Sequence, residues 1–206
     1  VFAQNHRLAR LTWMDETVVT IRPPVQVLGP ATVTPPPGAF LQATQDGEAA
    51  LSAAVKEIVG RAHRVVDLFA GSGTFSLPLS VAAEVWAIEG DAAMTTALDK
   101  GWRGAQGLKK VTATSRDLFR RPLEPDELKG WDVAVLDPPR AGAAAQVATI
   151  ADSTVNRVAM VSCNPVTFGR DVAALVAAGF AVDWVHVVDQ FRWSPHVEMV
   201  ASLTRA

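Results

Sequence analysis

Short apolar runs separated by amphipathic windows dominate the sequence from residue 46 onward. The runs are rich in valine and are bounded by glycine or polar residues, which is typical of buried parallel strands. The expected strands are Arg64–Leu68, Val85–Ile88, Val111–Thr114, Asp132–Leu136 and Val158–Ser162. The expected helices are 46–60, Thr74–Ala82, Ala92–Trp102, Ala143–Ala151 and Val166–Ala178. This alternation predicts an α/β fold with a parallel, doubly wound sheet.

Both ends of the chain depart from this alternation of strands and helices. Residues 1–38 combine one short expected strand, Thr17–Ile21, with a proline-rich stretch, so they are interpreted as an N-terminal arm or the remnant of a preceding domain. Residues 39–206 then form the main domain. At its end, Phe180–Val188 and Glu198–Leu203 are strand-like with no helix between them. They predict an antiparallel hairpin at one edge, with the Glu198 strand as an edge strand.

Composition narrows the class of protein. The 206 residues are 49% hydrophobic and 19% charged, enough to fill the core of one domain. A single Cys excludes an internal disulfide and an all-cysteine metal site. The net charge of −2 is unlike that of a free-standing nucleic-acid binder. No apolar run or leader pattern points to a membrane or secretion, so a cytoplasmic protein is expected. The first residue is Val1, not Met, so a fragment of a longer protein is also expected.

A glycine-containing motif follows the first expected core strand. It runs from Asp67 to Phe75 and lets backbone approach a ligand, but it lacks the Lys-Ser/Thr of a phosphate-binding loop. Glu89 ends the next strand, 22 residues after Asp67, where a carboxylate can accept the ribose hydroxyls of an adenosine cofactor. The alternative is a tight turn and a solvated carboxylate. Asp117, after the third strand, could face the adenine or cap a helix.

The fourth expected strand runs into Asp137-Pro-Pro-Arg140-Ala-Gly142. The two prolines make a stiff loop that can hold Asp137 against a polar edge such as a nucleobase. Methyltransferases that act on amino groups of adenine or cytosine carry an aromatic residue where Arg140 stands. Arg140 therefore argues against the amino-methylating class.

The fifth expected strand runs into Ser162-Cys163-Asn164-Pro165. Asn164 suits a helix N-cap and Pro165 the first helical position. Cys163 would then lie beside a helix N-terminus, where the dipole favours a thiolate by about 0.3 to 1 kcal/mol. A reactive nucleophile and an inert buried thiol remain equally open.

Glu198 opens the last expected strand, two residues after His196. It is either a solvated carboxylate or a general base in a partly dry pocket. His196 could orient it, contact phosphate, or simply be exposed. No second ligand stands at a credible spacing, so no metal site is expected.

Together with Phe40-Leu41-Gln42, these motifs resemble the S-adenosylmethionine-dependent RNA uridine C5-methyltransferases, which form 5-methyluridine in tRNA and 23S rRNA. The resemblance spans about Phe40 to Leu203 and implies a Rossmann-like class I methyltransferase fold with a mostly parallel seven-stranded sheet. It implies Cys163 as nucleophile and Glu198 as base. The cofactor-binding positions it implies are Gln42, Phe69, Gly71, Gly73, Thr74, Glu89, Asp117 and Asp137. Those for the target uracil are Phe40, Gln42, Asp137 and Arg140.

Thr74 departs from an Asn that is common in this family, which leaves its side-chain contact open. The expected partner is a tRNA or rRNA, held by an RNA-anchoring domain outside this chain. Two alternatives remain: a non-catalytic RNA-binding or assembly module with the same fold, and a class I methyltransferase acting on another substrate, in which Cys163 is structural.

Overall fold

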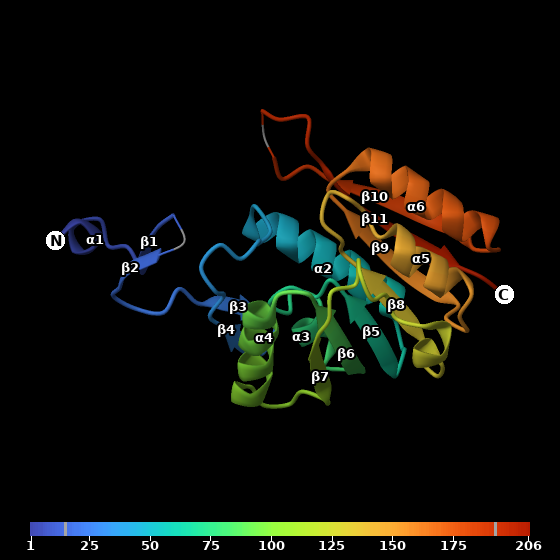
Figure 1. Cartoon of the computed structure of the whole chain (residues 1–206), viewed down its shortest axis with the longest axis horizontal. Helices are drawn as coiled ribbons and strands as arrows, with labels where there is room; N and C mark the ends of the chain where they lie inside the picture. Colours follow the sequence, from blue (N-terminus) through green and yellow to red (C-terminus); the bar gives the residue numbers. More distant parts are fainter. Residues whose placement is uncertain (15, 192) are drawn as a thin grey trace.

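A seven-stranded sheet forms the centre of the protein in the computed structural model, which describes residues 1–14, 16–191 and 193–206 (Figure 1). Its strand order is β10-β11-β9-β8-β5-β6-β7. The strands are β5 Arg64–Leu68, β6 Glu84–Glu89, β7 Val111–Ser115, β8 Val133–Leu136, β9 Arg157–Ser162, β10 Ala181–Val188 and β11 Glu198–Thr204. Strands β5 to β9 pair in parallel, and β11 is antiparallel to both neighbours. The predicted α/β fold, mostly parallel with an antiparallel C-terminal hairpin, is confirmed.

The sheet reverses its winding direction beside β5. The chain first adds β6 and β7 on one side of β5, and then crosses to add β8 and β9 on the other side. Open α/β sheets bind ligands at such a switch point, outside the carboxyl ends of the strands. The expected ligand site therefore lies beyond Leu68, Glu89 and Leu136.

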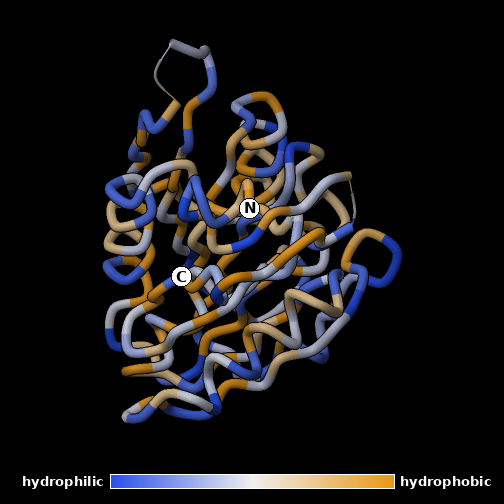
Figure 2. The backbone as a smooth tube through the Cα atoms, turned by 90° about the vertical axis from the view of Figure 1, so that its left-hand side faces the viewer, coloured by the Kyte–Doolittle hydropathy of each residue, from blue (hydrophilic) through white to orange (hydrophobic). Residues whose placement is uncertain are grey.

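Alternate residues of each strand enter two separate cores, one on each face of the sheet. Val65 and Val133 belong to the first core, whereas their successors Val66 and Ala134 belong to the second. The helices are α2 Gln45–Val59, α3 Ser76–Leu79 and α4 Ala92–Gly104 on the first face, and α5 Ala144–Ala151 and α6 Pro165–Ala177 with the 3₁₀ turn Pro125–Leu128 on the second. Hydrophobic and hydrophilic positions alternate along the outer helices (Figure 2). In the described ranges, no helix has the length and apolarity needed to cross a membrane.

The predicted helices α2, α4, α5 and α6 form within two residues of the expected ends, but α3 is much shorter than the predicted Thr74–Ala82. Gly73, at φ +101°, precedes α3 in a turn that no helix can include. At the other end, the Ser80 hydroxyl donates to the Leu77 carbonyl, which a continuing helix would use for a backbone hydrogen bond. Local backbone chemistry therefore limits α3 to Ser76–Leu79.

The last strand is not the edge strand that the sequence predicted. β11 lies between β9 and β10, and β10 forms the edge. Every residue from Glu198 to Leu203 is buried, whereas most of β10 is exposed. β11 has apolar side chains on both faces, so it needs cover on both, while β10 carries Asp183 and His186 and tolerates solvent.

The N-terminal segment has two parts. Helix α1 Phe2–Asn5 and the hairpin β1 Arg10–Trp13 with β2 Glu16–Thr20 lie to one side of the sheet (Figure 1). A second hairpin, β3 Gln26–Leu28 with β4 Ala31–Val33, packs on α4, and its Leu28, Ala31 and Val33 side chains join the first core. Part of the proline-rich stretch thus closes the core, while the domain boundary near residue 38 stays a prediction.

Gly101 of α4 provides a test of this packing. A Cβ at Gly101 would lie 2.6 Å from Cγ2 of Val33 and 3.4 Å from the Thr32 carbonyl, both in β4. We expect Gly101→Leu to lower the free energy of unfolding by about 1–3 kcal/mol through overpacking. Urea unfolding measures this. The matched control is Gly104→Leu in the same helix, where a Cβ would meet nothing within 4 Å. Equal stability of the two variants would contradict the packing of β3–β4 on α4.

Candidate active site

Side chains from the carboxyl ends of the five parallel strands and from the start of β11 meet in one cavity. Because β11 runs antiparallel, its first residue lies at the same edge as the last residues of β8 and β9. The cavity has a volume of about 430 Å³. Most of the predicted site residues line it: Phe40, Gln42, Phe69, Gly71, Thr74, Glu89, Asp117, Asp137, Arg140, Cys163 and Glu198.

Gly73 is a predicted site residue that does not line the cavity. Its φ is +101°, and a Cβ there would lie 2.9 Å from Leu77 and 3.0 Å from Leu98. Glycine is required at this position by the turn and by close packing in the core, so Gly73 can affect a ligand only through the shape of the loop.

Gly71 and Glu89 form one wall of the cavity. One oxygen of the Glu89 carboxylate accepts from the Gly71 N–H and the other from the Asp91 N–H, both at 2.9 Å. Gly71 has a φ of +56°, and a Cβ there would point into open space. A ligand can therefore approach the Gly71 backbone closely. The carboxylate is held in place and keeps lone pairs for ligand hydroxyl groups.

Aromatic rings line the cavity together with the carboxylates of Glu89 and Asp117, and they make part of it apolar. Phe69 adopts a left-handed φ of +64°, and its ring lies 5.4 Å from that of Phe119. Asp117 accepts from the Phe119 and Arg120 N–H groups, so it caps a turn and also lines the cavity. Strained φ values in non-glycine residues concentrate at functional sites. An apolar slot beside carboxylates suits a flat heteroaromatic ring.

Further lining residues were not predicted from the sequence: Ala70, Phe75, Gly90, Met94, Leu118, Phe119, Pro138 and Pro139. Pro138 and Pro139 belong to a motif that the sequence had already singled out. Phe119 follows Asp117 by two residues, and its place just beyond the third strand was the available signal. Met94 lies on α4 and carried no such signal.

Strand register brings Cys163 and Glu198 together. In the antiparallel β9–β11 pair, Met199 is opposite Ser162, so the next positions outward are Glu198 and Cys163. Asp137 arrives from the other side, because β8 is the parallel neighbour of β9. Residues far apart in the sequence therefore meet around one end of the cavity.

The two carboxyl groups at this end have raised pKa values. Glu198 is 1% exposed, and its burial raises the pKa to about 7, with a side-chain hydrogen bond from Gln190 acting in the opposite direction. Burial also raises the pKa of Asp137 to about 8, with smaller contributions from the negative charges of Glu198 and Asp67. A carboxyl with a pKa near neutrality is suited to general acid–base catalysis at neutral pH.

Cys163 is half-buried, directly before α6. The predicted cap is confirmed: the Asn164 side chain accepts from the Val166 N–H at 3.1 Å, and Pro165 is the first helical residue. The small effect predicted for the helix dipole does not decide the titration of this thiol. Burial, followed by the charges of Glu198 and Asp137, raises the pKa of Cys163 above its usual value, and outweighs a backbone hydrogen bond and Arg140.

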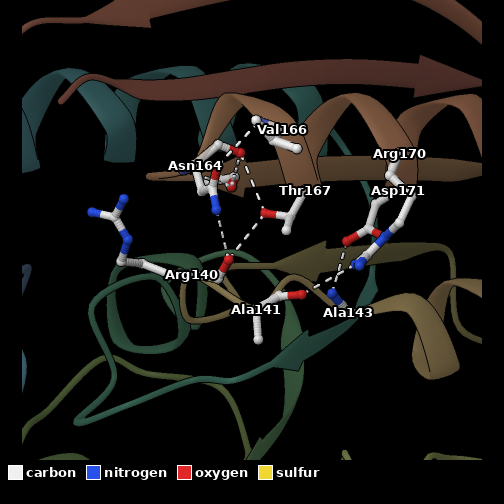
Figure 3. A network of polar contacts seen from close by, with 9 residues as sticks. Arg140, Ala141, Ala143, Asn164, Val166, Thr167, Arg170 and Asp171 are labelled. Carbon is white, nitrogen blue, oxygen red and sulfur yellow. Dashed lines mark hydrogen bonds and ion pairs between the residues drawn. The ribbon is translucent and has the colours of Figure 1, made fainter. Parts of the chain in front are cut away.

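The loop after β8 is held by α6 (Figure 3). The Arg140 carbonyl accepts from Nδ2 of Asn164 at 2.9 Å and from the Thr167 hydroxyl at 3.2 Å. Asp171, which is 2% exposed, accepts from the Ala143 N–H at 2.7 Å. The helix that begins after Cys163 therefore fixes the backbone of the loop that carries Asp137.

The Arg140 side chain extends away from this network (Figure 3) and lines the cavity. Its Nη1 lies 3.3 Å from Nδ1 of His196, which is exposed. His196 therefore contacts Arg140, and not Glu198 as one interpretation of the sequence had it.

The fold and the cavity define a class of protein. A doubly wound sheet with an inserted antiparallel last strand, and a cavity at the carboxyl ends of its parallel strands, is the architecture of the Rossmann-like class I methyltransferases. More narrowly, the chain belongs to the tRNA (uracil-5-)-methyltransferase family, whose model matches residues 104–206.

Individual relatives agree with this family. The chain is 52% identical over 205 residues to an uncharacterised RNA methyltransferase of Mesorhizobium japonicum, covering 100% of this chain and 49% of the relative. It is 38% identical over 172 residues to the 23S rRNA (uracil(1939)-C(5))-methyltransferase RlmD of Chromohalobacter salexigens, covering 82% and 35%. The chain spans about half the length of the curated relatives that it matches at highest identity.

A solved structure is similar as well. The tRNA (uracil-54, C5)-methyltransferase of Pyrococcus abyssi, in complex with S-adenosyl-L-homocysteine, superposes with a TM-score of 0.74 at 27% identity. The match covers 87% of this chain and 43% of that protein.

The raised pKa of Cys163 can be measured directly, since Cys163 is the single cysteine of the 206 residues. We expect the rate of alkylation by iodoacetamide to rise with pH with a midpoint above that of an ordinary cysteine, about 8.5, because the thiolate is the reactive form and its pKa is raised. Glu198→Gln should move the midpoint to lower pH by removing a negative charge. Glu57→Gln, on the exposed face of α2, is the control. A wild-type midpoint below about 8.5, the ordinary cysteine value, would contradict this.

Proposed function

We propose that the chain is the catalytic domain of an S-adenosylmethionine-dependent RNA (uracil-C5)-methyltransferase that forms 5-methyluridine, with Cys163 as nucleophile and Glu198 as base. One observation carries the proposal: Cys163 and Glu198 line the same cavity as Glu89 and Asp117. A thiol, a carboxyl with a pKa of about 7 and a cofactor-type pair of carboxylates thus share one site. This favours an enzyme over a non-catalytic module with the same fold.

The cavity fits the cofactor. Glu89 would accept the ribose hydroxyls, and Asp117 with the Phe69 ring would hold the adenine. Gln42, Thr74 and Asp137 would bind near the methionine part, where Gly71 leaves the backbone open. When bound, S-adenosylmethionine would supply an electrophilic methyl group on a sulfonium.

The thiol is needed because C5 of uracil is a poor nucleophile. The Cys163 thiolate adds to C6, and the electron pair of the C5–C6 double bond moves toward O4, giving an enolate with carbanion character at C5. This carbanion character would make C5 able to take the methyl group that bound S-adenosylmethionine would supply, with the electron pair of the carbon–sulfur bond remaining on sulfur. Arg140, which lowers the pKa of Cys163, is placed to donate to the developing oxyanion at O4.

Glu198 completes the reaction. Its carboxylate removes the proton from C5, the electron pair re-forms the C5–C6 double bond, and the bond from C6 to the Cys163 sulfur breaks to release the thiolate. The proton remains on Glu198, whose pKa of about 7 allows it to leave to solvent at neutral pH. Phe40, Gln42, Asp137 and Arg140 would hold the uracil ring meanwhile.

The target uridine must leave its stack to reach this cavity. Phosphate attraction supplies much of the affinity for RNA, and a chain with net charge −2 offers little of it. We therefore place the RNA-anchoring function in sequence beyond these residues. The family to which the chain belongs favours a tRNA or rRNA as the target.

RNA containing 5-fluorouridine tests the nucleophile. Fluorine at C5 cannot be removed as a proton is, so the Cys163–C6 bond should persist after methylation. We expect the full-length protein with cofactor to form an adduct that survives a denaturing gel, and Cys163→Ala to form none. The control is Ser162→Ala, one residue earlier. An adduct with Cys163→Ala, or none with wild type, would overturn the proposed mechanism.

Normal uridine RNA tests the base. Glu198→Gln keeps the shape of the side chain but cannot take the C5 proton, so we expect the methylated adduct to accumulate and turnover to fall by about 10²–10⁴-fold. Gel mobility and release of methylated RNA measure the two effects. Normal turnover with no accumulation would remove Glu198 from this role.

A further inference from the structure

Gln190, in the loop between β10 and β11, joins two groups of the active site although the sequence did not single it out. It is 7% exposed. Its amide Nε2 donates to Oε1 of Gln42 at 2.7 Å, and its side chain also forms a hydrogen bond with the Glu198 carboxylate. One buried side chain thus contacts both a cavity amide and the proposed general base.

This contact determines which atoms Gln42 presents to the cavity. With Oε1 of Gln42 accepting from Gln190, its Nε2 faces Asp137, at 3.5 Å from Oδ2. Gln42 therefore offers a donor to the cavity, which complements a carbonyl oxygen of uracil. A reversed amide would present an acceptor instead.

The orientation of the Gln190 amide is fixed by its neighbours. If it were reversed while Gln42 stayed as it is, two amide oxygens would face each other, which is electrostatically unfavourable. As placed, Oε1 of Gln190 is buried without a hydrogen-bond partner among the described residues, so the donation to Gln42 is kept at the cost of one unsatisfied acceptor.

Gly47, in the first turn of α2, provides the space for this amide. A Cβ at Gly47 would lie 2.2 Å from Oε1 and 2.9 Å from Cδ of Gln190. The φ of Gly47 is not left-handed, so the backbone does not require glycine there. The same Cβ would lie 2.9 Å from Oγ1 of Thr44, the N-cap of α2, so the need for glycine comes mainly from Gln190 and partly from this cap.

We propose that Gln190 is a positioning residue that fixes the donor face of Gln42 toward the uracil and holds Glu198 ready to accept a proton. This proposal rests on the proposed function. Its test measures the titration of the Glu198 carboxyl directly, in addition to the turnover of RNA.

Other ionisable groups surround Glu198, and their charges must be kept constant in such a test. Those on the neighbouring elements are Asp67, Asp137, Arg140, Cys163 and His196, together with Asp46 and Glu48 in the first turn of α2. Of these, the Glu48 carboxylate accepts a hydrogen bond from Nε2 of Gln26, and Nδ1 of His196 lies 3.3 Å from Nη1 of Arg140. Replacing the neutral Gln190 by neutral methionine leaves all of these charges in place.

The primary measurement is a carbon-13 NMR titration of the Glu198 carboxyl in the full-length protein, assigned with Glu198→Gln. Gln190→Met removes a hydrogen bond that favours the charged carboxylate, so the Glu198 midpoint should rise by about one pH unit. In a plot of kcat against pH for uridine RNA, the fall of kcat on the acidic side should move to higher pH by the same amount. Raising the pH should then restore kcat, while KM for RNA stays elevated because Gln42 is no longer oriented.

Gly47→Ala is an independent variant on another element. The added methyl group displaces Gln190 and crowds Oγ1 of Thr44, but it removes no polar group. Alanine favours the helix by about 0.5–1 kcal/mol, so the fold should be retained. We expect the same upward shift of the Glu198 midpoint. The matched control is Gln146→Met, a second buried glutamine, whose side chain accepts from the Leu123 N–H far from the site and should leave the midpoint unchanged.

An unchanged midpoint in Gln190→Met and Gly47→Ala would overturn the proposal. So would a loss of kcat that is uniform across pH, since that is the signature of a purely structural role. If wild type does not methylate uridine, the proposed function fails, and the NMR midpoints still decide whether Gln190 controls Glu198.

Discussion

The pairing of β11 with β9 is the constraint on which the site depends. Backbone hydrogen bonds place Met199 opposite Ser162, and this register sets Glu198 beside Cys163. A slip of one residue would turn every β11 side chain to the opposite face of the sheet. Val200 packs in one core, and Ala201 and Leu203 in the other, so such a slip would exchange side chains of different size between two close-packed cores. The hydrophobic core therefore determines how closely the proposed nucleophile and base approach each other.

The same convergence has an electrostatic consequence. Burial raises the pKa of Glu198 to about 7, and burial with smaller contributions from the charges of Glu198 and Asp67 raises that of Asp137 to about 8, which suits proton transfer near neutral pH. Burial, followed by the charges of Glu198 and Asp137, also raises the pKa of Cys163. The environment that suits Glu198 to act as a base therefore disfavours the thiolate form of Cys163. In the proposed reaction the two groups act at different stages, and Arg140 is the neighbour whose charge favours the thiolate. Gln190 opposes the effect of burial on Glu198.

Much of this could be predicted from local sequence. The apolar runs predicted β5 to β9, and Gly60 and Asn164 are local signals that place helix ends. Most predicted site residues line one cavity because each follows a strand, and parallel strands end at the same edge. Burial pattern, capping and turn chemistry are properties of neighbouring residues along the chain, so the sequence alone was sufficient for them.

The remaining features depend on residues that are distant in sequence. No local pattern indicates that β11 enters the sheet between β9 and β10, or that β3–β4 packs on α4, because strand pairing and close packing depend on the complementary surface of another segment. The pKa of Cys163 depends on carboxyls from two other strands, against which a helix N-terminus is a small influence. Gln190 acquires its contacts only when its loop closes over α2. Chemistry carried by single motifs could thus be predicted from the sequence, whereas the register and the charges around them follow from the assembled fold.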